Sequence, residues 1–183
     1  MKSLGLQTLS LTAIDPGNRL RTIDEAYAQL LADNIKAFGG LRQPIEVRRK
    51  GKRDGAYVLI AGGHRLRAFA QLGWTEIPAF VFDASEEEGR LAEIDENLIR
   101  HDLNPLDRAV FLYERKDIYL RLHPETAAGV AGAKARHGKT AMANLAIAAF
   151  AACFARDVRE RTGMSDRAVR RAVEIAHTNG PRY

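Results

Sequence analysis

A short run of glycine and basic residues, Gly62-Gly63-His64-Arg65-Leu66-Arg67, has the residue types and spacing for chemistry. The apolar residues Tyr57 to Ile60 precede it and predict a buried strand, and the apolar spacing after it predicts a helix up to Gly73. The free amides and the dipole at the start of a helix attract an anion, and arginines add charge-assisted donors. The run therefore predicts a phosphate site. The open alternative is an ordinary strand-to-helix turn whose arginines face water.

Alternating apolar patterns predict the strands that hold this turn. We expect strands over residues 9–14, 43–47, 57–60 and 77–82, the first of them at a sheet edge. Pro78 places the last of these either at a sheet edge or with the proline near the start of the strand. Residues 50–55 read as a hairpin turn.

Capping residues predict where the helices begin and end. Asp24 is suited to cap a helix over residues 26–38 that ends at Gly39. Ser85 and Glu88 form a capping box at the start of a helix that runs through Leu98. A third helix is expected from Asn104-Pro105 to about residue 122, and residues 129–139 are expected to be a linker.

The net charge of +5 is concentrated at the C-terminal end of the chain. Residues 134–183 carry ten Lys or Arg and four Asp or Glu, whereas residues 1–133 have a net charge of −1. Such a basic segment is suited to meet a polyanion, and the alternative is a basic surface that faces water.

Residues 157–173 have the pattern of a helix-turn-helix. Gly163 provides the turn, and we expect Val158, Met164, Val169 and Ala172 to be buried between the helices. The outward face of the second helix would bind DNA through Ser165, Asp166, Arg167, Arg170 and Arg171. The alternative is a pair of basic amphipathic helices with no role in DNA binding.

Arg159 occupies a position of this motif that is usually small. Either its stem extends out of the helix packing towards water, or the register of the motif differs from the predicted one.

Composition narrows the class of protein. The chain has 183 residues, 46% of them hydrophobic, and no apolar run of about 18 residues that would predict a membrane span. A single cysteine, Cys153, forms no internal disulfide, which favours a reducing cytoplasm. The five histidines show no metal-ligand spacing, so we expect no structural zinc.

Three ordered motifs resemble the N-terminal domain of the ParB partition-protein family, which belongs with the sulfiredoxins in one superfamily. They are Gln43-Pro44-Ile45, then the stretch from Ala61 to Ala68, then the stretch from Glu96 to Leu106. In the family these read roughly Q-P-I, G-E-R-R-x-R-A and E-N-L-Q-R-x-D-L-N-P. The resemblance covers about residues 7–122.

The resemblance implies an α+β fold. It consists of a small mixed-sheet ParB/sulfiredoxin-like domain over residues 1–103 and an all-α DNA-binding domain over residues 104–183, with the helix-turn-helix near 154–176. It also implies a bound nucleotide, CTP in the family's segregation proteins, together with Mg²⁺. The resemblance implies that Gly62, Arg65, Arg67, Glu96 and Asn97 bind the nucleotide, and we expect Gly63, His64 and Arg100 in the same nucleotide site. Glu96 and Asn97 would also bind Mg²⁺, since a carboxylate and an amide oxygen are suited to that ion.

Two positions depart from the family motif. Gly63 and His64 stand where the family has glutamate and arginine, so a carboxylate associated with hydrolysis and a phosphate-binding cation are both missing.

Three functions stay open. The first is a ParB-like DNA-binding protein of plasmid or chromosome partition or of transcriptional control, acting at the nucleoid and open to homodimerisation. The second is a nucleotide-using enzyme, a weak triphosphatase or a nuclease of the superfamily, for which we assign no catalytic residue. Sulfinic-acid reduction is disfavoured because the run from Gly62 to Arg65 lacks the sulfiredoxin cysteine. The third is an adaptor that keeps the fold and binds no nucleotide.

Overall fold

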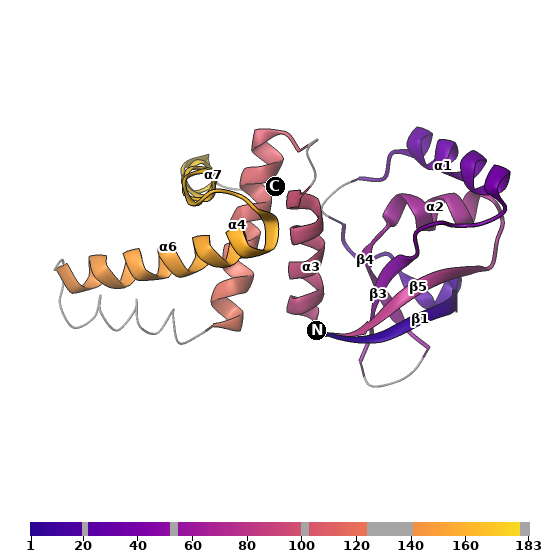
Figure 1. Cartoon of the computed structure of the whole chain (residues 1–183), viewed down its shortest axis with the longest axis horizontal. Helices are drawn as coiled ribbons and strands as arrows, with labels where there is room; N and C mark the ends of the chain where they lie inside the picture. The colour runs from indigo at the N-terminus through magenta and orange to yellow at the C-terminus, as the bar shows by residue number, and fades with distance from the viewer. Residues whose placement is uncertain (20–21, 52–54, 100–102, 124–140, 180–183) are drawn as a thin grey trace. The chain divides into compact units, whose positions relative to one another are not determined.

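The computed structural model divides the chain into two compact units, Met1–Glu93 and Ile94–Tyr183 (Figure 1). It describes residues 1–19, 22–51, 55–99, 103–123 and 141–179, without the side chains of residues 141–150 and 176–179. The division along the chain falls within a helix, about ten residues before the domain boundary that we expected at 103/104. The expected boundary stays a prediction, and the expected linker at 129–139 lies outside the described residues.

The first unit is built on a five-stranded mixed sheet. Its strands are β1 (Lys2–Ser10), β2 (Ile14–Asp15), β3 (Ile45–Arg49), β4 (Tyr57–Ala61) and β5 (Glu76–Asp83), in the order β1-β5-β3-β4-β2. The β1–β5 and β3–β4 pairs are antiparallel, and the β3–β5 and β2–β4 pairs are parallel. This arrangement brings β4, which leads into the glycine turn, beside β3, which carries the first motif.

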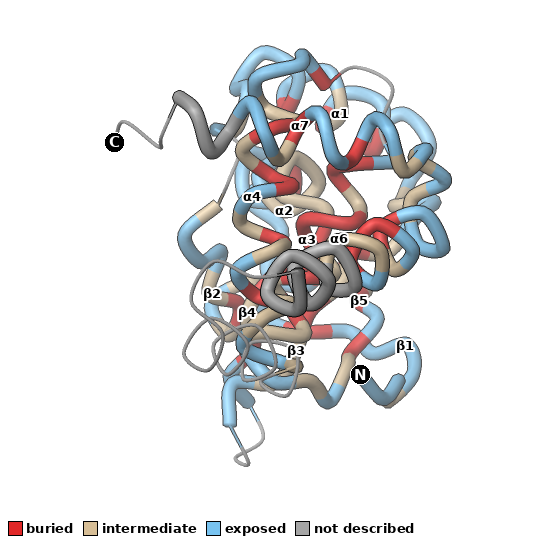
Figure 2. The backbone as a smooth tube through the Cα atoms, turned by 90° about the vertical axis from the view of Figure 1, so that its left-hand side faces the viewer, coloured by how far each residue is buried: buried red, intermediate tan, exposed pale blue. Residues whose placement is uncertain are grey.

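Two helices cover one face of this sheet (Figure 1). They are α1 (Glu25–Phe38) and α2 (Gly63–Gln71), which pack against each other. Alternate residues of the strands face these helices and form the core, which includes Ile45, Val47, Ile77, Ala79 and Val81, all fully buried (Figure 2). Period-2 burial of this kind leaves the other face of β5 partly exposed at Phe80.

The predicted strand over residues 9–14 is wrong. Its first residues end β1, residues Leu11–Ala13 form a 3₁₀ turn (η1), and Ile14 starts β2. The reason is the length of the partner strand: Ser10 pairs with Glu76, the first residue of β5, so β1 has no partner beyond it. The chain then turns and pairs with β4 at the opposite edge.

Pro78 lies near the start of an inner strand. β5 lies between β1 and β3, so the edge alternative for this strand is wrong. The pairing with β3 begins at Ala79, so the missing amide of Pro78 removes no hydrogen bond from that pairing.

The second unit is helical. It contains the end of α3 (Glu86–Ile99), α4 (Pro105–Leu122), α6 (Ala141–Thr162) and α7 (Asp166–Asn179), with α7 packed on α4 and α6. Its core includes Leu112, Ile118, Phe154, Val158 and Val169. Among the described residues, no helix combines the length and the hydrophobicity that a membrane crossing requires.

The predicted helix starts are confirmed. Asp24 accepts hydrogen bonds from the amides of Ala26 and Tyr27, and Gly39 ends α1 in a left-handed conformation. Ser85 and Glu88 exchange the two bonds of a capping box, at 3.1 and 2.8 Å. Asn104 accepts from the amide of Asp107 at 2.8 Å, with Pro105 at the first helical position.

Candidate functional site

The glycine turn has the backbone geometry that an anion site needs. Gly62 follows the last residue of β4 with a φ of 99°, and α2 begins at the next residue without any side-chain cap. The first amides of a helix have no partner within the helix, and a helix start of this kind is suited to an external acceptor. The turn itself is therefore as predicted, and its use by phosphate stays a prediction.

Only glycine fits at position 62. A Cβ there would lie 2.8 Å from Cγ2 of Ile45, in addition to the strain of its positive φ. We expect Gly62→Ala to lower the free energy of unfolding by about 2–3 kcal/mol, measured by urea unfolding. Gly73→Ala is the matched control, because Gly73 has a φ of 69° and no atom near its Cβ position. The control should lose only about 1 kcal/mol, and equal losses would contradict the close approach to Ile45.

Arg65 holds the first motif against the second. Its Nη1 donates to the carbonyl oxygen of Gln43 at 2.8 Å and also to that of Pro44. The guanidinium therefore links the start of α2 to the segment that enters β3. If Arg65 also binds phosphate, it must do so in addition to its hydrogen bonds with these two carbonyl oxygens.

Arg67 faces a different neighbour. Its Nε donates to both carboxylate oxygens of Glu25 on α1, at 2.9 and 3.0 Å, and Gln71 donates to the same carboxylate. Residues two apart in a helix do not share a face. The structure therefore does not bring Arg65 and Arg67 together as one pair of phosphate donors.

A cluster of two arginines and one glutamate lies at the end of β4. Arg19 donates to the carbonyl oxygens of Leu59 and Ile60, at 3.2 and 2.9 Å, and its Nε lies 3.3 Å from the carboxylate of Glu93. Arg90 donates to the same carboxylate at 2.9 Å, and the Glu93 side chain is 7% exposed. Two cations thus surround one buried anion, beside the turn. Sequence reasoning missed this cluster, because the residues come from distant segments without a motif.

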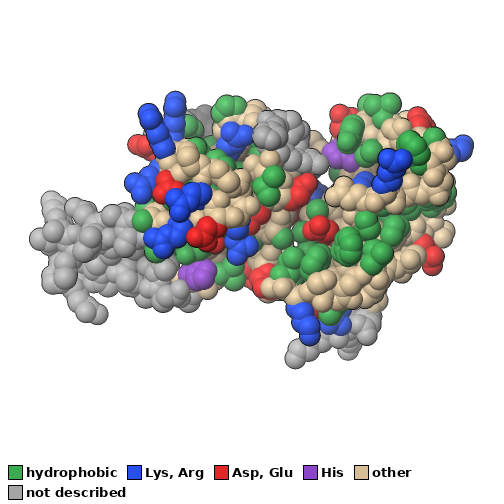
Figure 3. All heavy atoms as spheres, viewed as in Figure 1, with side chains coloured by type: hydrophobic (Ala, Val, Ile, Leu, Met, Phe, Trp, Pro, Cys, Tyr) green, Lys and Arg blue, Asp and Glu red, His purple; other side chains and the backbone are tan. Residues whose placement is uncertain are grey.

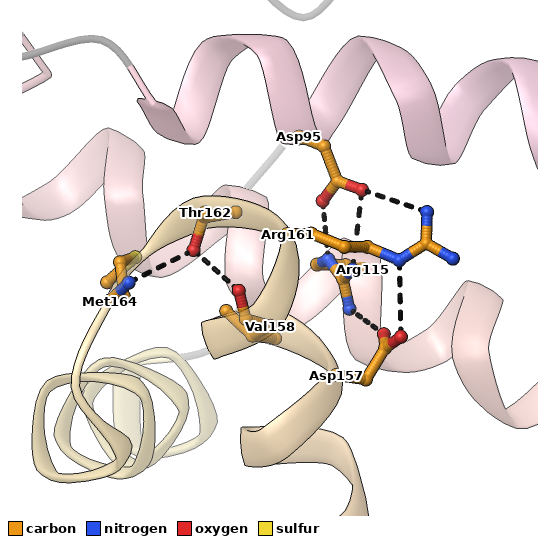
Figure 4. A network of polar contacts seen from close by, with 7 residues as sticks. All are labelled: Asp95, Arg115, Asp157, Val158, Arg161, Thr162 and Met164. Carbon is orange, nitrogen blue, oxygen red and sulfur yellow. Dashed lines mark hydrogen bonds and ion pairs between the residues drawn. The ribbon is translucent and has the colours of Figure 1, made fainter.

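The connection between α6 and α7 is a three-residue turn. Thr162 ends α6: its hydroxyl donates to the carbonyl oxygen of Val158 at 2.7 Å and accepts from the amide of Met164 (Figure 4). Gly163 follows with a φ of 72°, and the hydroxyl of Ser165 accepts from the amide of Ala168 at 3.3 Å. The predicted glycine turn and serine cap are confirmed.

The two faces of α7 differ in chemistry. Val169 and Ala172 are buried, as is Val158 on α6, while Met164 is only half-buried. Arg167, Arg170 and Arg171 are exposed. Figure 3 has the same view as Figure 1, where α7 is labelled. Basic side chains, with acidic ones among them, gather on the surface in that region. The predicted face for DNA is therefore accessible in this unit.

Arg159, at a position of the helix-turn-helix pattern that is usually small, faces outward. It is exposed, and its Nη1 lies 3.3 Å from a carboxylate oxygen of Asp166 across the turn. Its stem therefore extends towards water, which is the first of the two alternatives. Asp166 has a structural partner, and its predicted contact with DNA stays a prediction.

A network of ion pairs centred on Arg115 joins α3, α4 and α6 in the second unit (Figure 4). The Arg115 side chain is fully buried, with Nε 2.7 Å from Asp95 and Nη1 2.7 Å from Asp157. Arg161 lies 3.2 Å from Asp157 and 3.8 Å from Asp95. Burial alone would lower the pKa of Arg115, but the hydrogen bonds and charges of the two aspartates outweigh it and raise that pKa. The sequence analysis did not identify this network.

The family model of the ParB N-terminal domain matches residues 1–98, which is more than half of the chain. The chain belongs to this family. The resemblance drawn from the three motifs is confirmed, and so is the predicted mixed-sheet fold.

Curated relatives of this ParB N-terminal domain include partition proteins and nucleoid occlusion proteins. A probable plasmid-partitioning protein ParB of Thermus thermophilus is 48% identical over 82 residues, 45% of this chain and 26% of that protein. A probable chromosome-partitioning protein ParB of Neisseria meningitidis is 40% identical over 128 residues, 68% of this chain and 43% of that protein. The chain thus spans less than half the length of either relative.

A solved structure shows the same fold. The N-domain of a pNOB8-like ParB superposes with a TM-score of 0.62 at 15% sequence identity, covering 99% of this chain and 72% of that one. The likeness extends from the mixed sheet to the helical unit.

One of the two departures from the ParB motif, His64, has a packing role here. His64 accepts a hydrogen bond from the amide of Asp24 at 3.0 Å through Nε2, and its ring meets Tyr27 edge-on. A Cβ on Gly63 would lie 2.9 Å from Cδ1 of Ile23, a flexible side-chain end. His64 thus joins the start of α1 to the start of α2. Its predicted contact with a nucleotide stays a prediction.

The remaining predicted residues of the ParB site lie towards the end of α3. Asn97 is buried and Glu96 is half-buried, both in the second unit. Arg100 lies outside the described residues. Within the described part of the chain, no three His, Cys, Asp or Glu side chains gather as a metal site. Binding of Mg²⁺ by Glu96 and Asn97 stays a prediction.

Proposed function

We propose that this chain binds duplex DNA through the exposed face of α7, as part of a ParB partition protein. The observation that carries the proposal is the division of α7 into a face buried at Val169 and Ala172 and a face that exposes Arg167, Arg170 and Arg171. The buried face fixes the helix on α4 and α6. The exposed arginines can then meet phosphates or guanine edges in a major groove.

The charge distribution and the family support this function. The excess positive charge of the chain falls in residues 134–183, which contain α7. The curated relatives named above are plasmid- or chromosome-partitioning proteins. Transcriptional control uses the same contacts with DNA and stays an alternative outcome of that binding. Either role would place the protein at the nucleoid.

Salt dependence tests the proposal directly. We expect a fluorescently labelled duplex to bind the chain with an affinity that falls as salt rises between about 50 and 200 mM. Three phosphate contacts would give a slope of about −3 in a plot of log K against log salt. An absence of binding, or an affinity independent of salt, would contradict the proposal.

We further propose that the glycine turn binds the phosphates of a nucleoside triphosphate, with CTP and Mg²⁺ as the ligands that the family resemblance implies. Two observations favour it: α2 begins without a side-chain cap, and the cluster of Arg19, Arg90 and Glu93 lies at the end of β4, beside that turn. The arginine cluster raises the local potential, because two cations accompany a single carboxylate.

Thermal unfolding with Mg²⁺ and CTP, ATP or GTP tests the nucleotide proposal. We expect CTP to raise the melting temperature, since a hundredfold excess over Kd stabilises by about 2.7 kcal/mol. Arg65→Ala and Arg67→Ala, each compared with its own ligand-free state, separate the two predicted phosphate donors. A melting temperature that no nucleotide changes would favour the adaptor alternative. Phosphate release in the same samples, or cleavage of duplex DNA added to them, would indicate the enzyme alternative.

A further inference from the structure

A row of large apolar side chains is exposed along α1. Tyr27, Leu30 and Phe38 are 51%, 61% and 64% exposed. Together with the exposed Asn34 they are spaced three or four positions apart, so these four residues follow one side of the helix, and we call them the outer row. Single exposed apolar residues are common, whereas a row of large ones indicates an interaction surface.

The two ends of the outer row carry opposite charges. Asp24 caps α1 beside Tyr27 and accepts a hydrogen bond from the amide of Tyr27 at 3.1 Å. Arg42 follows the C-terminal end of the helix, and its guanidinium carbon lies 4.3 Å from the centre of the Phe38 ring. Asp24 and Arg42 are both exposed. A complementary partner therefore needs a cation at the Asp24 end, an acid at the Arg42 end and apolar side chains between them.

We infer that the outer row binds α1 of a second copy of this chain, in antiparallel orientation. An antiparallel copy of α1 supplies the required charge at each end, because it places its own Arg42 near Asp24 and its own Asp24 near Arg42. The facing residues pair about one centre, with all midpoints at residues 32–33: Asp24 with Arg42, Tyr27 with Phe38, and Leu30 with Asn34. One two-fold axis therefore satisfies the apolar and the charged contacts together.

The inference is independent of the proposed DNA binding. The outer row belongs to the first unit, whereas α7 belongs to the second. The oligomeric state of the full chain is therefore measured without DNA, and its result leaves the function of α7 open. A contact between two single helices is smaller than a standard protein interface, so we expect a weak dimer.

Sedimentation equilibrium over about 1 to 500 µM protein tests the inference. We expect the wild-type chain to show a monomer–dimer equilibrium. Leu30→Glu should raise the Kd of the dimer by about tenfold or more, because association would bury an unpaired charge. Leu106→Glu is the matched control, since Leu106 is 64% exposed on α4 of the second unit, and it should keep the wild-type Kd. Circular dichroism would show that both variants keep their helices.

The charged ends test the antiparallel orientation. Arg42→Glu should raise the Kd about fivefold, because two acids then face each other at each end of the row. Adding Asp24→Asn removes this repulsion and keeps the helix cap, since asparagine also caps helices, so the double variant should dimerise more tightly than Arg42→Glu alone. A wild-type chain that stays monomeric overturns the inference. A Kd that Leu30→Glu leaves unchanged, or a double variant without recovery, also overturns it.

Discussion

Replacement of Arg115 by alanine is expected to lower the free energy of unfolding by about 3–5 kcal/mol. The side chain is fully buried and donates to Asp95 on α3 and Asp157 on α6. Its loss leaves two poorly exposed carboxylates without their main cation, and removal of one partner from a buried ion pair is strongly destabilising. Urea unfolding followed by circular dichroism measures the change.

Arg121→Ala is the control on the same helix. Arg121 pairs with Asp117 at the surface, where its side chain is 56% exposed, so its loss should change stability by less than about 1 kcal/mol. A triple variant with Arg115→Met, Asp95→Leu and Asp157→Leu should recover most of the stability, because apolar side chains can replace a buried ion network. Equal losses in Arg115→Ala and Arg121→Ala would contradict the role of the network.

The parts of this fold that sequence predicts are those that local chemistry decides. Asp24, Ser85 and Asn104 cap helices through bonds to amides within three residues, so their signal lies in a few consecutive letters. Gly163 and Ser165 likewise mark their own turn. Residues 9–14 show where local patterns fail to predict the structure. Apolar and polar residues continue to alternate there, although the partner strand β5 pairs no further than Ser10.

The parts that sequence leaves out depend on distant partners. Arg115 lies 20 and 42 residues from the aspartates it binds, and Arg19 reaches carbonyl groups 40 and 41 residues away. Arg65 looks like a phosphate donor by type and spacing, yet two of its acceptors are backbone carbonyls, which every residue has. The sequence shows which groups a side chain can bind, but the fold determines which acceptor lies next to it.

The double variant Arg170→Ala with Arg171→Ala is expected to weaken duplex DNA binding by about a hundredfold, since hydrogen bonds to charged groups contribute about 1.5 kcal/mol or more each. Both side chains are exposed, and alanine favours helix, so α7 should stay folded. Loss of two phosphate contacts would also reduce the salt slope by about two. Fluorescence anisotropy at several salt concentrations measures both quantities.

The same titration separates two modes of contact. If Arg170 and Arg171 bind phosphates, the double variant loses affinity for every duplex and its salt slope falls. If they bind guanine edges, the loss is confined to the preferred sequence. A control with Arg42→Ala and Arg121→Ala removes equal charge from other exposed positions and should change affinity little. If the variant with Arg170→Ala and Arg171→Ala binds duplex DNA with wild-type affinity at every salt concentration, these two arginines make no contact with DNA. That result would rule out α7 as the DNA-binding helix and would leave its exposed arginines as an ordinary basic surface that faces water.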